Sequence, residues 1–310
     1  MKQKILMCVT IDTECDKSLS WHNSEPLTFR SVEEAIPDLL TPIFQEYGVK
    51  PTYFLSPEVI EEESCQKVLK ELTSAELGTH LHSDFIGPMK TIEDMAGYNA
   101  DACQTDYPEE VEFQKLRNLT NLFSDVFEQK PRVFRAGRFS ANLNTLKALH
   151  SLGYLVDSSF TPYCTWLTPK GNLIDHSQTP EEPYFPDLKN EDESSSPQLL
   201  EIPLTIVKRK IPLRQKVSWL RPVFSSPTAM KRIIRNKAAS PPSKYPKVLN
   251  MMFHSEELVP CASPYTKNKA DIDKYVSALK RVFDFAILKG CKFTSQEEIH
   301  KEYSSIYLNG

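Results

Sequence analysis

The sequence predicts an α/β protein, an irregular (β/α) barrel with loop insertions in a single domain that spans residues 1–310. Short apolar runs alternate with helical patterns along most of the chain, as strands alternate with crossover helices in a parallel barrel. Acidic and imidazole side chains follow directly after several of these runs, and the functional groups of such barrels lie at the carboxyl ends of the strands. A chain of 310 residues is also long enough to bury a full core.

The first half of the chain contains the patterns of four strands and of the helices between them. Residues 5–11 form a short apolar run that predicts a buried strand. Ser31-Val-Glu-Glu is a capping-box pattern that predicts a helix running to Tyr47, and Gly48 follows where a helix should end. Ser56-Pro-Glu predicts a further helix with proline in its first position. The other expected elements of this half are strands at 50–55, 76–80 and 133–135, and helices at 66–72 and 108–129.

The second half continues the alternation but carries two insertions. The elements expected here are helices at 142–152 and 270–288, strands at 154–156, 199–203 and 248–253, and a short run after residue 290 before a terminal helix. One insertion, 165–197, is rich in proline and acidic residues and includes an expected solvated loop at 190–196. The other insertion, 205–248, is basic.

The basic insertion separates charge along the chain. Between residues 202 and 255 there are 12 lysines and arginines and no acidic residue, although the whole chain has a net charge of −4. Residues 226–237 predict a capped amphipathic helix with Met230, Ile233 and Ile234 among its cations. One hypothesis is a lid packed over the barrel. Another is a surface that contacts anionic lipid or a diphosphate-linked glycan. No nucleic-acid-binding module is evident, so nucleic acid is not an expected partner.

Composition places the chain among ordinary globular proteins. It is 40% hydrophobic and 25% charged, and it has no apolar run long enough for a transmembrane helix. The N-terminus has a basic start and a short apolar run, but acidic residues follow at once without a cleavage site, which favours a first strand over a signal peptide. Seven scattered cysteines without a CxxC pair favour free thiols in a reducing cytoplasm. The expected location is therefore cytoplasmic, with membrane association through the basic insertion as a second hypothesis.

Three short motifs carry most of the chemical signal. Alternate residues of an extended strand share a face, so the two acids of the first motif lie on one side, as do the two imidazoles of the second. Carboxylate and imidazole ligands suit a divalent metal such as Zn²⁺. An isolated DxE or HxH is often an ordinary strand end, so the combination and its order carry the prediction of a metal-dependent hydrolase. The motifs are Thr10-Ile-Asp12-Thr-Glu14, Gly78-Thr-His80-Leu-His82-Ser-Asp84 and Met252-Phe-His254-Ser.

These motifs, with three further segments, resemble those of the polysaccharide deacetylase family, the NodB-homology type of carbohydrate esterase (family 4). The resemblance runs through most of residues 4–300. Within the family, the chain is similar to a branch associated with cell-surface glycan genes, whose members share the segments HLH, FRAGRFS and MMFHS. The further segments are Tyr47-Gly-Val-Lys-Pro-Thr-Tyr-Phe-Leu, Phe134-Arg135-Ala-Gly-Arg138-Phe and Tyr154-Leu-Val-Asp157-Ser-Ser.

The resemblance implies roles for individual residues. Asp12 would be the catalytic base, with Arg135 holding it ionised. His254 would be the catalytic acid, with Asp157 holding its imidazole. Asp157 is equally well read as a turn residue that binds its own backbone.

The metal ligands implied by the resemblance are less regular. Glu14 and His80 would bind the metal, although Thr13 separates two acids that are usually adjacent in the family. The position of the family's second histidine is Asp84, and the family register favours Asp84 slightly over His82 as the third ligand. His82 would then support a ligand or contact substrate.

The implied activity is a divalent-metal-dependent removal of an acetyl group from an N-acetylated sugar, with zinc as the expected metal and cobalt or nickel as alternatives. The sugar would be a surface-glycan precursor, possible carriers being a lipid or a nucleotide. The alternatives are an O-deacetylase or another C–N amide hydrolase on the same fold, and a catalytically degenerate carbohydrate-binding protein. Arg138 is open between substrate contact and a surface ion pair. Trp21 and His22 are open between stacking on a sugar and anchoring a loop.

Overall fold

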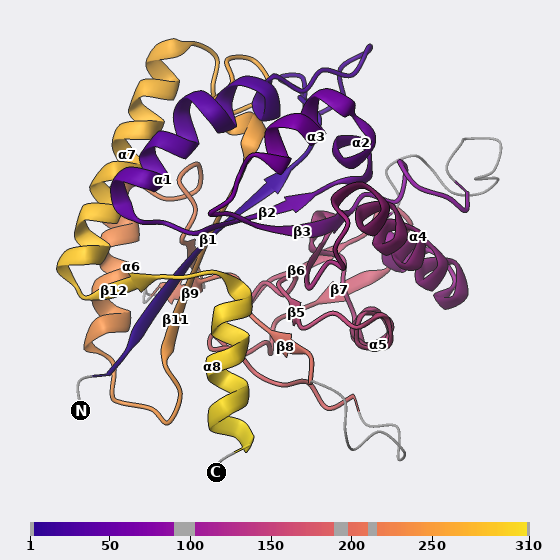
Figure 1. Cartoon of the computed structure of the whole chain (residues 1–310). Coiled ribbons are helices and arrows are strands. Elements are labelled where there is room, and N and C mark those ends of the chain that lie inside the picture. Colours follow the sequence, from indigo (N-terminus) through magenta and orange to yellow (C-terminus); the bar gives the residue numbers. More distant parts are fainter. Residues whose placement is uncertain (1–2, 90–102, 189–197, 210–215, 309–310) are drawn as a thin grey trace.

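A curled parallel sheet organises the chain in the computed structural model, which describes residues 3–89, 103–188, 198–209 and 216–308. The strand order is β11-β1-β2-β3-β4-β5-β8, and β12 also pairs with β1. Every pairing within this sheet is parallel. The predicted (β/α) barrel is confirmed in the form of a curled half-barrel with flanking helices (Figure 1). The strands are β1 (Ile5–Thr13), β2 (Pro51–Leu55), β3 (Glu76–Leu81), β4 (Val133–Ala136), β5 (Val156–Asp157), β8 (Leu200–Glu201), β11 (Lys247–His254) and β12 (Cys291–Phe293).

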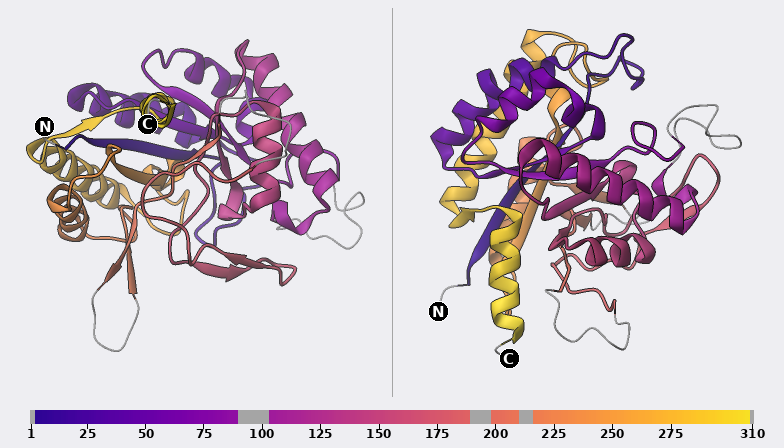
Figure 2. Two further views of the ribbon diagram at one scale, coloured as in Figure 1. Left: turned by 90° about the horizontal axis from the view of Figure 1, so that it is seen from below. Right: turned by 45° about the vertical axis from the view of Figure 1, so that its right-hand side comes forward.

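Helices cover the outside of the sheet, and two hairpins project from it (Figure 2). The hairpins are β6 (Thr165–Leu167) with β7 (Leu173–Asp175), and β9 (Ile206–Arg209) with β10 (Lys216–Trp219). The longer helices are η1 (Ser31–Leu40), α1 (Thr41–Tyr47), α3 (Glu63–Lys70), α4 (Glu109–Phe127), α5 (Leu143–Leu152), α6 (Pro227–Ala239), α7 (Lys269–Leu288) and α8 (Gln296–Leu308). The short ones are α2 (Pro57–Glu61), η2 (Gln104–Asp106), η3 (Gly137–Phe139) and η4 (Ser255–Leu258).

The pleat of β1 decides which side chains enter the barrel. Successive strand residues point to opposite faces. Ile5, Met7, Val9 and Ile11 pack in the outer core, among the helices. Leu6 and Cys8 pack in a separate inner cluster with Ile299 and Tyr303 of α8. On the same face, Thr10 and Asp12 follow nearer the carboxyl end of the strand. Therefore α8 closes the apolar end of the barrel, and the polar end carries Asp12.

The two ends of the strand order come together through one short contact. Thr205, four residues after β8, donates its N–H to the carbonyl of Asn250 in β11 at 3.1 Å. The Asn250 N–H donates in turn to Thr205 Oγ1 at 2.7 Å. This reciprocal pair bridges β8 and β11, which lie at opposite ends of the sheet.

The helix expected from Ser31 to Tyr47 is confirmed in extent and in its end at Gly48, which has φ 63°. Its predicted capping box is wrong. Ser31 is already helical, and Arg30 before it makes no side-chain cap. Instead, Asp16 accepts from the N–H groups of Arg30 at 3.0 Å and Ser31 at 3.1 Å. A carboxylate distant in sequence thus satisfies the free donors of this helix start.

The basic insertion supplies α6, whose start at Ser226 is confirmed, because the Ser226 hydroxyl accepts from the N–H of Ala229. The hypothesis that this segment contacts anionic lipid is not supported, because the apolar side of α6 does not face outward. Met230, Ile233 and Ile234 are buried in the main core, and α6 packs against α7 and β11 like the other outer helices. Residues 190–196, and residues 210–215 of the basic insertion, lie outside the described part of the chain. Within the described ranges, none of the helices combines the length and apolar character that crossing a bilayer needs.

The lack of space around Gly78 shows how tightly the inner face of the sheet is packed. A Cβ at Gly78 would lie 2.4 Å from Val133 Cγ2 and 2.6 Å from the Val133 carbonyl oxygen. Because strand β4 cannot retreat without breaking its pairing, we expect Gly78→Ala to lower the free energy of unfolding by about 1–3 kcal/mol. Urea unfolding measures this loss. Gly87→Ala is the matched control, since a Cβ there meets nothing within 4 Å. Equal stability of the two variants would contradict the packing argument.

Candidate functional site

A pocket of about 470 Å³ opens at the carboxyl ends of the strands. All three sequence motifs contribute to its wall. The motif side chains that line it are Asp12, Glu14, His80, His82, Asp84 and His254. The structure therefore brings these six predicted site residues together, whereas Arg135 and Asp157 lie behind the wall. Arg138 lines the pocket as well.

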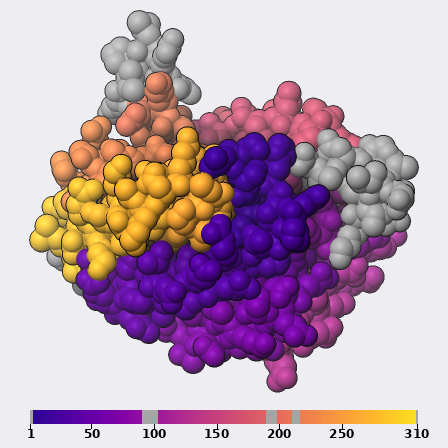
Figure 3. All heavy atoms as spheres, turned by 90° about the horizontal axis from the view of Figure 1, so that it is seen from above, coloured from indigo at the N-terminus to yellow at the C-terminus, as the bar shows by residue number. Residues whose placement is uncertain are grey.

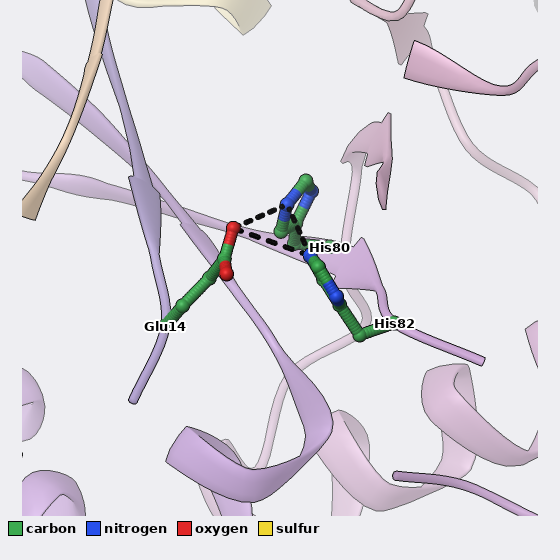
Figure 4. Close-up of side chains that lie close together, drawn as sticks. All are labelled: Glu14, His80 and His82. Atoms are coloured by element: carbon green, nitrogen blue, oxygen red, sulfur yellow. Dashed lines mark hydrogen bonds and ion pairs between the residues drawn. The ribbon is translucent and has the colours of Figure 1, made fainter. Parts of the chain in front are cut away.

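Three donor atoms form a triangle in this pocket (Figure 4). Glu14 Oε1 lies 3.3 Å from His80 Nε2 and 3.2 Å from His82 Nε2. The two imidazole Nε2 atoms are 3.2 Å apart. Ligand atoms bound to zinc at about 2.0–2.2 Å in a tetrahedral arrangement lie about 3.4 Å from one another. The triangle therefore has the dimensions and the donor types of a three-ligand site with an open position.

Neighbouring groups orient the three donors. His80 Nδ1 donates to the carbonyl of Arg135 at 2.9 Å, which leaves the Nε2 lone pair facing the triangle. Lys17 Nζ lies 3.0 Å from Glu14 Oε2, so that the other oxygen, Oε1, faces the imidazoles. Gly137 leaves room for His82, because a Cβ there would lie 3.2 Å from the imidazole ring and 2.5 Å from the carbonyl oxygen of Leu81. These supports suit a site that is set before any ligand arrives.

Asp84 is not a member of this triangle, so the geometry favours His82 over Asp84 as the third donor. β3 ends at Leu81, and Asp84 lies beyond it in a turn, whereas His82 directly follows the strand. Asp84 still lines the pocket, and its Oδ1 is buried without a hydrogen-bond partner among the described residues. That oxygen is available to a ligand.

Arg135 supports Asp12 from inside the barrel, as the sequence predicts. Its guanidinium is fully buried and donates from Nη1 to Asp12 Oδ1 at 2.6 Å. It also donates to Thr10 Oγ1 at 2.9 Å and to the carbonyl of Ser158 at 2.8 Å. Each of the three guanidinium nitrogens thus donates a hydrogen bond, and the carboxylate partner is fixed toward the pocket.

The charges around the pocket shift its titrating groups. Burial raises the pKa of Asp12, but Arg135 and then His80 outweigh it, so that the pKa lies below its ordinary value. Burial likewise acts against ionisation of Glu14, while His82 and Lys17 hold its pKa well below the ordinary value. Burial lowers the pKa of His80, but the carboxylates of Asp12 and Glu14 raise it overall. Two ionised acids and a readily protonated imidazole result.

His254 faces the carboxylates from the neighbouring strand, β11. Asp12 and His254 are direct register partners on β1 and β11. The Nε2 atom of His254 lies 3.8 Å from Asp12 Oδ2 and 3.7 Å from Glu14 Oε1. A reacting group in the pocket therefore has Asp12 and His254 within reach together.

The prediction that Asp157 holds His254 is wrong. Asp157 pairs in register with Glu201 of β8 and accepts from the Ser159 hydroxyl at 2.6 Å. Burial raises the pKa of Asp157, and burial and the Asp157 charge raise that of Glu201, as expected for two acids that share a dry site. The turn-residue reading of Asp157 fits these contacts.

Glu257 takes the place expected for Asp157, and sequence reasoning missed it. His254 Nδ1 lies 3.2 Å from Glu257 Oε1 and 2.9 Å from Arg221 Nη2. Arg221 also donates to Glu257 at 2.6 Å, and the Tyr275 hydroxyl donates to the other oxygen at 2.7 Å. One sequence signal existed: Glu257 follows His254 by three residues, which is side-chain reach in the helical turn η4. Lys17 likewise follows Glu14 by three residues and forms an ion pair with its carboxylate.

Comparison with known proteins agrees with this geometry. Residues 25–156 match the family model for polysaccharide deacetylase. The chain is similar to the crystal structure of a probable polysaccharide deacetylase from Pseudomonas aeruginosa PAO1, at 14% identity and a TM-score of 0.55, over 97% of this chain and 91% of that one. It is also similar to Puue allantoinase, at 13% identity and a TM-score of 0.57, over 98% of this chain and 91% of that one. No curated protein matches the chain.

At such identities the structural matches establish a common fold, the NodB-type (β/α) barrel. The family model covers β2, β3 and β4, and with them the His80 motif and the Arg135 segment. The sequence match over residues 25–156 and the shared barrel together show that this chain resembles the polysaccharide deacetylase family.

Proposed function

We propose that the chain is a divalent-metal-dependent hydrolase that removes the acetyl group from an N-acetylated sugar. The observation that carries this proposal is the triangle of Glu14, His80 and His82 beside two groups suited to proton transfer, Asp12 and His254. The family match adds an acetylated carbohydrate as the substrate class.

Glu14, His80 and His82 are the residues that would hold the metal, and two imidazoles with one carboxylate suit Zn²⁺. When bound, such a cation supplies Lewis acidity that polarises a carbonyl and makes water a stronger nucleophile. Cobalt and nickel remain alternatives for the same donors. The proton transfers of the reaction would be carried out by side chains of the protein.

Asp12 is suited to accept the proton of the attacking water. Its pKa lies below the ordinary value because Arg135 outweighs the cost of burial, so it is ionised at neutral pH. Arg135 also fixes one of its oxygens, Oδ1, and leaves Oδ2 toward His254. The contact with Arg135 therefore orients the carboxylate of Asp12, the proposed base.

His254 is suited to donate a proton to the departing amine. An amide nitrogen leaves poorly unless it is protonated, so the acid is needed for an N-acetyl substrate. Glu257 lies at Nδ1 and orients the ring so that Nε2 faces the pocket. The unpartnered Oδ1 of Asp84 would accept from a sugar hydroxyl at the pocket wall.

A second candidate is hydrolysis of another C–N bond, because the same base and acid serve any amide and an allantoinase shares the fold. A cytoplasmic surface-glycan precursor as substrate stays a prediction. Release of acetate from N-acetylated sugars, measured beside O-acetylated sugars and allantoin, separates these activities. Turnover of allantoin without acetate release would favour the second candidate.

The third metal ligand is tested by two single variants. We expect His82→Ala to weaken zinc binding by more than about 100-fold, because it removes a vertex of the triangle. Asp84→Ala should change zinc affinity by less than about threefold, since Asp84 lies outside the triangle. Competition with a chromophoric chelator measures both. If only the Asp84→Ala variant lost zinc, Asp84 and not His82 would be the third ligand, as the family register implies.

Proton donation is tested at His254. We expect His254→Gln to lower kcat on an N-acetyl substrate by about 10²–10⁴-fold while zinc affinity stays within a fewfold of wild type. An O-acetyl ester should lose less, because an alkoxide leaves more readily than an amide anion. Glu257→Gln is the companion variant, with a smaller loss. Unchanged kcat in His254→Gln would remove it as the acid.

Metal binding should depend on pH with a definite sign. The pKa of His80 in the metal-free protein is raised, so its imidazole keeps a proton that the metal must displace. Zinc affinity should therefore fall about tenfold per pH unit below that pKa and level off above it. Glu14 does not contribute in this range, because its pKa lies well below the ordinary value. Calorimetric titration with zinc between pH 5 and 9, roughly the range in which histidine titrates, measures this dependence. A zinc affinity that does not change with pH would contradict the prediction. The control is His150→Gln, because His150 lies outside the pocket.

A further inference from the structure

A second set of donor atoms lies beside the triangle of Glu14, His80 and His82 and shares Glu14 with it. One donor atom each of Glu14, His254 and Glu256 lies within 4.8 Å of the other two, and all three residues are buried. These three residues are here called the second triangle. Glu14 directly follows β1, His254 ends β11 and Glu256 lies in η4. The two strands pair in register, and in Figure 3 the indigo N-terminal atoms lie directly beside the orange and yellow C-terminal ones.

Glu256 differs from the other buried acids around His254 because it has no cation of its own. In the described ranges, no lysine or arginine forms an ion pair with Glu256. Each of the other three acids pairs with a buried cation, and these pairs are Asp12 with Arg135, Glu14 with Lys17 and Glu257 with Arg221. Buried carboxylates in proteins are normally paired or bound to a metal.

One oxygen of Glu256 lacks a partner. The side chain is fully buried, and Oε1 has no hydrogen-bond partner among the described residues. The other oxygen, Oε2, accepts from the Ser255 hydroxyl at 3.3 Å. A buried polar atom without a partner requires an explanation, such as an ion that the site binds. A cation in the second triangle would supply the partner that Oε1 lacks.

His254 offers its Nε2 atom to the same place. Its Nδ1 atom is already surrounded, 2.9 Å from Arg221 Nη2 and 3.2 Å from Glu257 Oε1. Nε2 lies 3.7 Å from Glu14 Oε1, on the side of the carboxylates. Two carboxylates and one imidazole are donors that Zn²⁺ accepts. The second triangle therefore has the chemistry of a zinc site.

The dimensions of the second triangle predict weaker binding than at the first. The donor atoms of the first triangle are 3.2–3.3 Å apart, close to the separation of about 3.4 Å expected around zinc. In the second triangle, Glu14 Oε1 and His254 Nε2 are 3.7 Å apart, so the donors must draw together when an ion binds. Two cations that share the Glu14 carboxylate also repel each other. The second triangle should therefore fill only after the first.

We propose that the second triangle binds a further Zn²⁺ ion, more weakly than the first triangle, and that this ion inhibits hydrolysis. When bound to Nε2 of His254, the ion occupies the position of the proton that His254 would donate to the departing amine. An N-acetyl substrate then keeps its poor leaving group. The inhibition rests on the proposed function, whereas the binding of the second ion can be measured without any substrate.

Zinc stoichiometry is the first test, measured by competition with chromophoric chelators of graded affinity. We expect two zinc ions per chain, the second bound about tenfold or more weakly than the first. Glu256→Gln removes a donor and should leave one ion. Glu58→Gln is the matched control and should keep two, because Glu58 is a buried acid with an unpartnered oxygen outside both triangles. A single ion in the wild-type chain, or two ions in Glu256→Gln, would overturn the inference.

The position of the second ion can be measured in the wild-type chain, without relying on a variant that folds. Crystals grown with excess zinc should show two peaks of anomalous scattering at the zinc absorption edge, one in each triangle. A second peak at any other place, with the second triangle empty, would contradict the assignment of Glu256 and His254 as ligands.

Activity tests the inhibitory role of the second ion. With the second triangle filled, kcat for acetate release from an N-acetylated sugar should fall about 10²-fold or more from its value with one equivalent of zinc. An O-acetyl ester should lose less, because its leaving group depends less on the acid. In Glu256→Gln the two zinc levels should give kcat values within about twofold of each other, whereas Glu58→Gln should keep the full decrease. Two bound ions with unchanged kcat would refute the inhibition.

The same measurements separate this inference from the proposed function. One bound ion with full activity in excess zinc would uphold the deacetylase and overturn the second site. Two bound ions in the two triangles, without acetate release at any zinc level, would uphold the second site and contradict the deacetylase.

Discussion

The buried guanidinium of Arg135 is the interaction on which the rest of the site depends. It reaches from β4 across the barrel interior to Asp12 and Thr10 on β1, and to Ser158 after β5. It also packs 4.4 Å from the centre of the Phe54 ring on β2. A cation without solvent is tolerable only when each donor has a partner, and losing one partner of such a pair costs about 3–5 kcal/mol. Arg135 therefore fixes the relative positions of three strands and aims the proposed base.

A polar layer surrounds this guanidinium and divides the barrel interior in two. The Ser158 hydroxyl accepts from Arg135 at 3.0 Å, from Asn250 at 2.9 Å and from Gln296 at 3.0 Å. Below it lies the apolar inner cluster closed by α8, and above it lies the pocket. Buried hydrogen bonds of this kind favour one arrangement, because a donor left without its partner would be costly. The layer explains how reactive groups can stand rigidly at one end of a barrel whose other end is an ordinary apolar core.

The pocket above the layer is assembled from pairs of local and distant contacts. Glu14 and Lys17, and His254 and Glu257, are each three residues apart, so that the loop after each strand supplies its own support. Distant contacts then set the geometry between loops, as where Arg221 lies 2.9 Å from His254 Nδ1 and 4.3 Å from the centre of the Phe224 ring. Metal chemistry, proton transfer and sugar binding would in this way share one set of supports. The closeness of these functions follows from the parallel sheet, which delivers the ends of β1, β3 and β11 to the same rim.

The sequence by itself determined the alternation of strands and helices, the helix ends at Gly48 and Ser226, and the six motif residues that meet in the pocket. These depend on local periodicity and on residue types at strand ends, which short segments carry within themselves. Only the tertiary structure decided that His82 and not Asp84 completes the triangle, because this depends on where β3 ends. It also decided that Asp16 caps a helix from a distance, that Glu257 replaces Asp157 at His254, and that the apolar side of α6 is core. In each case the sequence contains several residues of a suitable chemical type, and only the packing of distant segments determines which of them makes the contact.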